Sequence, residues 1–226
     1  MIECTAFHES NVEPSSTSPV IHGDEIADLA ALLQTSAQLV TVPLPWTTQD
    51  VPEMGTFEHW TRSVAVHVNG AVSEEQLEGL APPSLESGTR FLSRLAFAAT
   101  VFADLIGAKA VGVRVRLSLQ PQCPRFHADH VMTRAVWVAS GPGTQWLEDQ
   151  AADRSYLGHQ SGGKPDAESG LIRDPNGIHQ VGPNRLAVFK GTLWPGNEGR
   201  GVIHRSPSTN GQQPRLVATF DWLDAD

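Results

Sequence analysis

Residues 110–120, AVGVRVRLSLQ, decide the fold because their apolar side chains recur at every second position. Val111, Val113, Val115 and Leu117 fall on one face of an extended chain, and the intervening residues are Gly, Arg and Ser. A period of two residues is typical of a β-strand with one buried face. We therefore expect this segment to lie in a sheet that is covered on one side.

The region before this strand has a helical period instead. Apolar residues recur every three or four positions from Ser87 to Ile106, and Gly107 fits the left-handed residue that ends many helices. Such a helix can cover the apolar face of the sheet. Asp24 precedes another amphipathic pattern and is expected near its cap, and a further helix is expected between Ser73 and Pro82.

Downstream, short apolar segments alternate with turns rich in Pro and Gly, and we expect strands at 133–139, 144–148, 185–190, 200–205 and 215–222. Helices followed by many short strands predict a mainly β protein with flanking helices, namely a double-stranded β-helix, or jelly roll, with an N-terminal helical region. We divide the chain into a disordered tail (1–20) and a single domain (21–226), with a helical part (21–107) and a jelly-roll core (108–226). The polar segment 149–184 is expected to be a solvated loop, with a lid over a site as the alternative.

Composition excludes several classes of function. The chain has 226 residues and a net charge of −9, which disfavours a nucleic-acid duplex as partner. Its 2 cysteines cannot build a disulfide framework or a Cys-rich zinc site. The N-terminus has no secretory signal pattern, and no apolar run is long enough for a bilayer. We expect a cytoplasmic protein that acts on a small molecule or a protein; the oligomeric state is left open.

Three residues are typical of a metal site. His127 and Asp129 form an H-x-D pair after a strand and a tight turn, and alternation places both on one face. His204 lies in the short apolar strand GVIH. Two imidazoles and one carboxylate form the facial triad that leaves open positions on non-haem Fe(II). A second H-x-D, at His22 and Asp24, is better explained by helix capping.

Arg215 follows His204 at offset 11 and begins the strand RLVATFDW, where it shares a face with Thr219. Its guanidinium could hold the far carboxylate of a dicarboxylate co-substrate such as 2-oxoglutarate. Thr219 and Arg134 are further candidates for binding the co-substrate. For Arg134, a salt bridge at the edge of a strand is an equally good interpretation.

The remaining candidates are expected at the rim of the site. Trp146 is predicted to wall it, although core packing is the common role of a single Trp. Trp194 precedes the His204 strand in a shaped turn and is a candidate for substrate contact. Arg205 follows His204 directly and is assigned to the substrate or to supporting the metal ligands.

These motifs resemble a known superfamily. The H-x-D pair, the distal His and the Arg at offset 11, with RLAVFKG, GVIHRSP and PRLVATFDW, are similar to the Fe(II)- and 2-oxoglutarate-dependent dioxygenases, in their prolyl-hydroxylase-like branch. The segment LSLQPQCPRF has no Tyr, which that branch often has there. CPRFHADH, GPGTQWL and FKGTLWPGNEGRGVIHRSP also resemble a bacterial family defined only as a domain of unknown function.

The superfamily resemblance implies a hydroxylase or oxidative demethylase that uses Fe(II) and 2-oxoglutarate. A non-catalytic jelly roll that binds zinc through the same triad is the alternative. A zinc hydrolase ranks last, because the sequence has no H-E-x-x-H motif to supply a general base.

Overall fold

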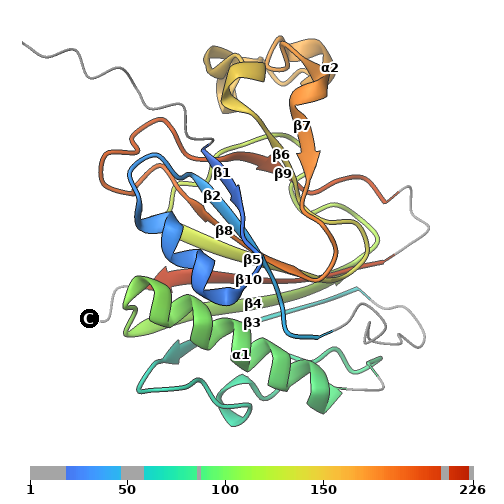
Figure 1. Ribbon diagram of the computed structural model, residues 1–226. Coiled ribbons are helices and arrows are strands. Elements are labelled where there is room, and N and C mark those ends of the chain that lie inside the picture. The colour runs from blue at the N-terminus through green and yellow to red at the C-terminus, as the bar shows by residue number, and fades with distance from the viewer. Residues whose placement is uncertain (1–18, 47–58, 86–87, 210–213, 224–226) are drawn as a thin grey trace, which may run out of the picture.

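The computed structural model describes residues 19–46, 59–85, 88–209 and 214–223. Most of the proposed N-terminal tail therefore lies outside the described residues. The described chain forms a large and a small β-sheet, and one long helix lies against the large sheet (Figure 1). Among the described residues, no helix combines the length and the apolar character needed to cross a lipid bilayer.

The large sheet has the strand order β1-β2-β8-β5-β10-β4-β3. Its strands are β1 (Val20–His22), β2 (Leu39–Pro43), β3 (Trp60–His67), β4 (Ala110–Ser118), β5 (Thr133–Ser140), β8 (Arg185–Lys190) and β10 (Arg215–Leu223). The small sheet has the order β7-β6-β9 and consists of β6 (Gln145–Leu147), β7 (Ile178–Gln180) and β9 (Ile203–Arg205). The strands expected between residues 110 and 223 are thus confirmed.

The chain crosses repeatedly between the two sheets. After β4 it reaches the small sheet, where His127 forms an isolated bridge with His204. It then returns to the large sheet at β5, forms β6 and β7 in the small sheet, and continues through β8, β9 and β10 in alternate sheets. This mainly β arrangement with few helices is consistent with the expected jelly roll.

Helix α1 (Gly88–Ile106) covers one face of the large sheet, as the sequence predicts. Phe91, Leu95 and Phe102 are buried there, and Phe102 packs on Phe220 of β10 at 6.4 Å between ring centroids. Burying each large apolar side chain contributes roughly 1.5–3 kcal/mol. Because the apolar residues of β4 and β10 face α1, the alternate residues of both strands lie on the opposite face of the large sheet.

The expected N-terminal helical region is wrong in most of its extent. Residues 21–107 contribute β1, β2 and β3 to the large sheet, and before α1 they form only the 3-10 helices η1 (Ile26–Leu33) and η3 (Glu75–Leu77) among the residues described there. Asp24 does not cap η1; instead the Asp28 carboxylate accepts from the amides of Asp24 and Glu25. Strand β2 is buried on both faces, so its sequence, LVTVP, shows no alternation.

Residues 149–184 are more ordered than a solvated loop. They contain η4 (Asp149–Ala151), η5 (Arg154–Tyr156), η6 (Gly158–Ser161), α2 (Asp166–Ser169), η7 (Pro175–Gly177) and β7. This insertion stands above the small sheet in Figure 1. Its buried residues form an apolar cluster with the outer face of that sheet: Phe126, Leu147, Ala151, Ala152, Leu171 and Ile203.

Candidate metal centre and adjoining cavity

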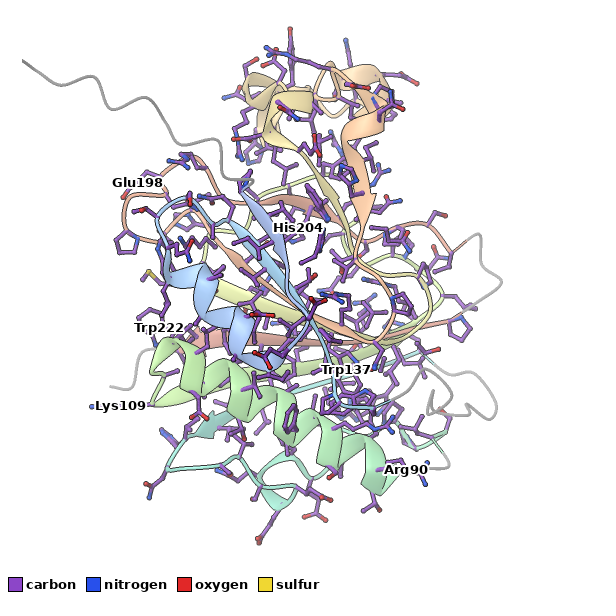
Figure 2. The ribbon with its side chains drawn as sticks, viewed as in Figure 1. Arg90, Lys109, Trp137, Glu198, His204 and Trp222 are labelled. Atoms are coloured by element: carbon purple, nitrogen blue, oxygen red, sulfur yellow. The ribbon has the colours of Figure 1, made fainter. Side chains whose placement is uncertain are left out.

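The structure brings His127, Asp129 and His204 together. The backbones of His127 and His204 exchange hydrogen bonds of 3.0 and 2.9 Å, which fixes the H-x-D segment beside β9. Each residue offers a ligand atom, and these atoms lie within 4.8 Å of one another. The His204 side chain faces the large sheet and contacts Phe189 of β8 at 4.5 Å between ring centroids (Figure 2).

A close approach of two loops holds Asp129 in place. The Asp129 carbonyl accepts from the amide of Thr192 at 3.0 Å, and the Met132 carbonyl accepts from the amide of Gly191 at 3.0 Å. A Cβ atom on Gly191 would overlap the carbonyl oxygen of Val131. Glycine at this position therefore allows the second loop to support the H-x-D segment.

Hydrogen bonds aim both imidazoles at the same point. Nδ1 of His127 bonds the Arg125 carbonyl at 2.9 Å, and Nδ1 of His204 bonds the Val202 carbonyl at 3.0 Å. Both Nε2 atoms are left facing the Asp129 carboxylate, each at 3.3 Å from one of its oxygens. Backbone carbonyls on the far ring nitrogens are typical of metal-ligating histidines.

Charges and hydrogen bonds among His127, Asp129 and His204 shift the pKa values of His127 and Asp129. Burial alone would raise the pKa of Asp129, but hydrogen bonds from His127 and His204 and the charge of Arg134 hold that pKa well below its usual range. Burial lowers the pKa of His127, yet hydrogen bonds with Asp129, Cys123 and the Arg125 carbonyl raise it to about 10. A cation bound here would replace the proton on His127.

Arg134 connects Asp129 to the large sheet. Its Nη1 donates to Asp129 at 2.6 Å, while Nε and Nη2 donate to the two oxygens of Asp221 at 2.6 and 3.0 Å. Arg134 and Asp221 are also directly paired across β5 and β10. Asp221 is a residue that the sequence interpretation missed, although the alternation of β10 places it on the face of Arg215.

Arg215 is a buried cation without an anionic partner among the described residues. Arg215 is 6% exposed, and within the described chain it donates only to the Pro142 carbonyl, the Ser206 hydroxyl and the Thr144 hydroxyl, at 2.7, 3.0 and 2.8 Å. Burial lowers the pKa of Arg215 to about 10. Thr219 lies on the same face of β10, and its buried hydroxyl has no hydrogen-bond partner within the described chain.

The other candidates differ in position. Trp146 is directly opposite His204 in the small sheet, and its buried indole nitrogen has no hydrogen-bond partner in the described part of the protein. Arg205 lies on the opposite face of β9 from His204, where it binds Asp166 of the insertion at 2.9 Å. Trp194 lies beneath the ammonium group of Lys190, at 5.0 Å from the ring centroid.

Strand pairing places four aromatic side chains in one row across the small sheet. His179 pairs with Trp146, Trp146 with His204, and His204 with His127. Neighbouring strands are about 5 Å apart, so Trp146 is one strand away from His204, a candidate metal ligand. His179, which the sequence interpretation also missed, stacks on Trp146 at 4.5 Å between ring centroids.

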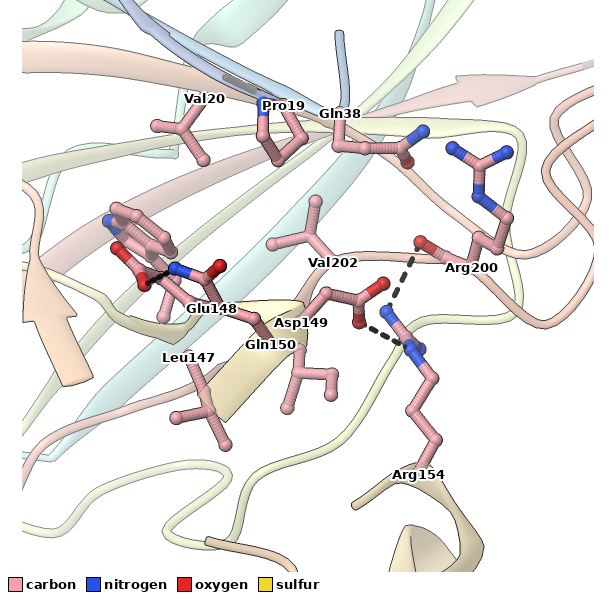
Figure 3. A pocket seen from close by; sticks show the side chains of 12 residues that line it. Pro19, Val20, Gln38, Leu147, Glu148, Asp149, Gln150, Arg154, Arg200 and Val202 are labelled. Atoms are coloured by element: carbon pink, nitrogen blue, oxygen red, sulfur yellow. Dashed lines mark hydrogen bonds and ion pairs between the residues drawn. The ribbon is translucent and has the colours of Figure 1, made fainter. Parts of the chain in front are cut away.

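A cavity of about 500 Å³ opens next to Trp146 (Figure 3). It lies where the end of β6 and the start of β9 approach the start of the described chain, and it is lined by Pro19, Val20, Gln38, Trp146, Leu147, Glu148, Asp149, Gln150, Arg154, Arg200, Val202 and Ile203. Its volume is within the range of small-molecule sites, roughly 300–1,000 Å³.

Fold and site thus define a mainly β protein of two facing sheets with a His-Asp-His cluster between them. The chain belongs to the family described as "Protein of unknown function (DUF1826)", which matches residues 23–221. This confirms the resemblance to a family of unknown function. No curated protein matches the chain.

Several solved structures are similar to the chain. A rice dioxygenase for auxin oxidation is 15% identical, with a TM-score of 0.47 and coverage of 93% of this chain and 84% of its own. A 2OG-Fe(II) oxygenase family protein from Caulobacter crescentus is 10% identical (TM-score 0.46, coverage 91% and 87%), and a Pseudomonas putida prolyl-4-hydroxylase is 14% identical (TM-score 0.39, coverage 87% and 100%). These identities and TM-scores are too low to carry a function over to this chain.

Proposed function

We propose that the protein is a non-haem dioxygenase that uses Fe(II) and 2-oxoglutarate to hydroxylate or oxidatively demethylate its substrate. The observation that carries this proposal is Arg215, a buried guanidinium that has no carboxylate partner among the described residues and lies on the same face of β10 as Asp221. A dicarboxylate supplies the missing anion. Metal storage alone gives no reason for such a cation.

The donor set fits the metal. His127, Asp129 and His204 would hold Fe(II) through two imidazole nitrogens and one carboxylate oxygen, which leaves positions for the co-substrate and dioxygen. Arg215 would pair with the far carboxylate of 2-oxoglutarate, and the Thr144 and Ser206 hydroxyls already orient its guanidinium. Bound Fe(II) and 2-oxoglutarate supply the oxidising chemistry by activating dioxygen while the co-substrate is decarboxylated.

The chain's own residues orient and shield the site. Nη1 of Arg134 donates to Oδ2 of Asp129. This bond fixes the orientation of the carboxylate and therefore the direction of its Oδ1. Phe189 covers one side of the His204 ring, which excludes water from that side. These contacts reduce the freedom of the ligands before a metal arrives.

A zinc-binding jelly roll is the second candidate. Cys123 lies close enough to His127 to raise the pKa of that histidine, and it offers a soft donor beside the triad, a ligand type that zinc accepts. In this reading, Arg215 would serve only to tie β10 to the turn at Pro142 and the hydroxyls of Thr144 and Ser206.

Anaerobic titration with Fe(II) and 2-oxoglutarate tests the proposal through the weak visible charge-transfer band of the chelated metal. We expect a band that disappears in His127→Ala and weakens in Arg215→Ala. His22→Ala is the matched control, because His22 belongs to the other H-x-D sequence and bonds to Thr41. Absence of the band, with zinc retained by the same histidines, would refute the dioxygenase and favour the second candidate.

A further inference from the structure

The insertion formed by residues 149–184 packs against the back of the candidate metal centre. It stands on the small sheet in Figure 1 and lies on the face of that sheet opposite to the His204 side chain. Phe126 and Ile203, each the residue before a candidate histidine ligand, are buried in the apolar cluster that the insertion forms with the small sheet. The insertion therefore supports both ligand-bearing segments from the side that faces away from the large sheet.

Asp166, the first residue of α2 in the insertion, has a buried carboxylate that contacts both of these segments. Its side chain is 7% exposed. Oδ2 of Asp166 accepts from the amide of Phe126 at 3.0 Å and from Nη1 of Arg205 at 2.9 Å. Phe126 directly precedes one candidate histidine ligand, and Arg205 directly follows the other. One carboxylate thus joins the two chain segments that form the bridge between these histidines.

The contact with Phe126 reaches the ring of His127 through a single peptide group. The amide N–H of Phe126 and the carbonyl of Arg125 belong to the same planar trans peptide bond. Its N–H donates to Asp166, and its carbonyl bonds Nδ1 of His127 at 2.9 Å. Because the peptide plane turns as one unit, Asp166 fixes the direction of the carbonyl that orients the imidazole. A negative charge at the N–H also polarises the peptide and strengthens the hydrogen bond at its carbonyl.

The contact with Arg205 holds the second ligand-bearing segment beside the first. Arg205 and His204 are neighbours in β9, so their side chains lie on opposite faces of the strand. Besides donating to Asp166, Arg205 donates from Nε to Oε1 of Gln145 in β6 at 2.8 Å. Its guanidinium also lies over the ring of Phe126, at 4.2 Å from the centroid. Arg205 therefore connects β9 with β6, with the H-x-D segment and with the insertion.

We propose that Asp166 is a positioning residue of the metal centre: it orients His127 through one peptide group and holds the His204 strand beside it through Arg205. The insertion is then a built-in support of the metal site. Removing an outer group that orients a metal ligand typically lowers metal affinity about 10–100-fold. This inference rests on the metal centre of the proposed function, but it applies to Fe(II) and to zinc alike and is tested by metal binding rather than by turnover.

Zinc affinity, measured by chelator competition, and the visible spectrum of the Co(II)-loaded protein test the proposal with two variants of Asp166. Asp166→Ala removes both contacts and should lower zinc affinity about 10–100-fold. At saturating Co(II), the same variant should change the position or intensity of the visible bands. Asp166→Asn keeps an acceptor oxygen and should lose less affinity. Glu168→Gln is the matched control for Asp166→Asn, because it removes the same charge from an exposed residue of α2, and it should match the wild type.

A second measurement needs no variant. Coupling between two sites is reciprocal, so if Asp166 improves metal binding, zinc must stabilise the contacts of the insertion by the same factor. Amide hydrogen exchange in residues 158–172 of the wild type should therefore slow when zinc binds. Exchange in η3, which packs on α1 and β3, serves as the control and should not change.

Three results separate the possibilities. If Asp166→Ala lowers the urea midpoint but keeps the zinc affinity and cobalt bands of the wild type, Asp166 only stabilises the insertion and the proposal is overturned. Exchange in residues 158–172 that does not respond to zinc would overturn it as well. Failure of the dioxygenase proposal would look different: Fe(II) and 2-oxoglutarate would give no charge-transfer band, while the effect of Asp166→Ala on zinc affinity would persist.

Discussion

The Arg215→Met variant tests whether Arg215 binds the co-substrate or only stabilises the fold. Burial lowers the pKa of Arg215 to about 10, and at about 1.4 kcal/mol per pH unit this corresponds to a cost of about 3.5 kcal/mol for keeping the guanidinium charged at neutral pH. The folded-state pKa is depressed, so this cost is fully present below pH 10. Met has a similar length and carries no charge, so the substitution removes the cost.

The same substitution also removes the hydrogen bonds of Arg215 to Pro142, Ser206 and Thr144. At about 1 kcal/mol each, their loss nearly offsets the gain. We therefore expect the free energy of unfolding of the ligand-free protein, measured by urea denaturation, to change by less than about 1 kcal/mol. With Co(II) and 2-oxoglutarate at about 100 times its Kd, the wild type should gain about 2.7 kcal/mol, and Arg215→Met should not.

Arg185→Met is the matched control. Arg185 also donates only to neutral groups, namely the hydroxyl and carbonyl of Thr41 and the carbonyl of Gly23, but it lies outside the site. This variant should be destabilised and should keep its response to 2-oxoglutarate. If Arg215→Met instead loses more than about 3 kcal/mol without ligand and still responds to 2-oxoglutarate, Arg215 is structural and the reasoning fails.

Three further outcomes follow from the site. Arg134→Met should destabilise the metal-free protein by about 2–3 kcal/mol in urea denaturation, because two partly buried carboxylates lose their cation; adding Asp221→Asn should restore part of the loss. Gly191→Ala should lower zinc affinity in chelator competition, because its Cβ would push Val131 and the H-x-D segment apart; unchanged affinity would show that the loops can yield. The raised pKa of His127 contributes stability that is fully present below pH 6.5 and is lost as the pH rises through about 10, so the metal-free urea midpoint should fall over that range while apparent zinc affinity increases; a flat profile would contradict the coupling.

Strands β4 and β10 could be predicted from their alternation, because each has one polar face and one core face. In β4 and β10, polar residues alternate with apolar ones, because α1 covers only one side. Strand β2 shows no such alternation, since it is buried on both faces between β1 and β8. Pro43 at its end adds a loop-like feature. Without alternation and next to a proline, β2 could not be recognised from its own sequence.

The candidate site likewise contains residues that the sequence identifies and residues that it does not. The His-Asp-His cluster could be predicted because a facial triad needs particular residue types at local spacing, H-x-D and a strand His. The pairing of Arg134 with Asp221 spans 87 positions and depends on the register of β5 against β10, which no local pattern encodes. The role of Arg205 depended on which face of a three-residue strand it occupies, and the structure places it against the insertion.

The distribution of unsatisfied polar atoms argues that the space between the sheets is built for a polar ligand. An unpaired buried polar group costs about 1–3 kcal/mol, so a fold selected only for stability should have few of them and scatter them. In the described chain they belong to Thr61, Arg116 and Thr219 on the faces of β3, β4 and β10 that are turned away from α1, to Trp146 on the face of β6 that packs against the large sheet, and to Arg154 of the insertion. The described core beneath α1 contributes none of them. Stability is therefore given up on the side of the large sheet where the His-Asp-His cluster and Arg215 lie, which is the expected pattern when local rules are broken for function.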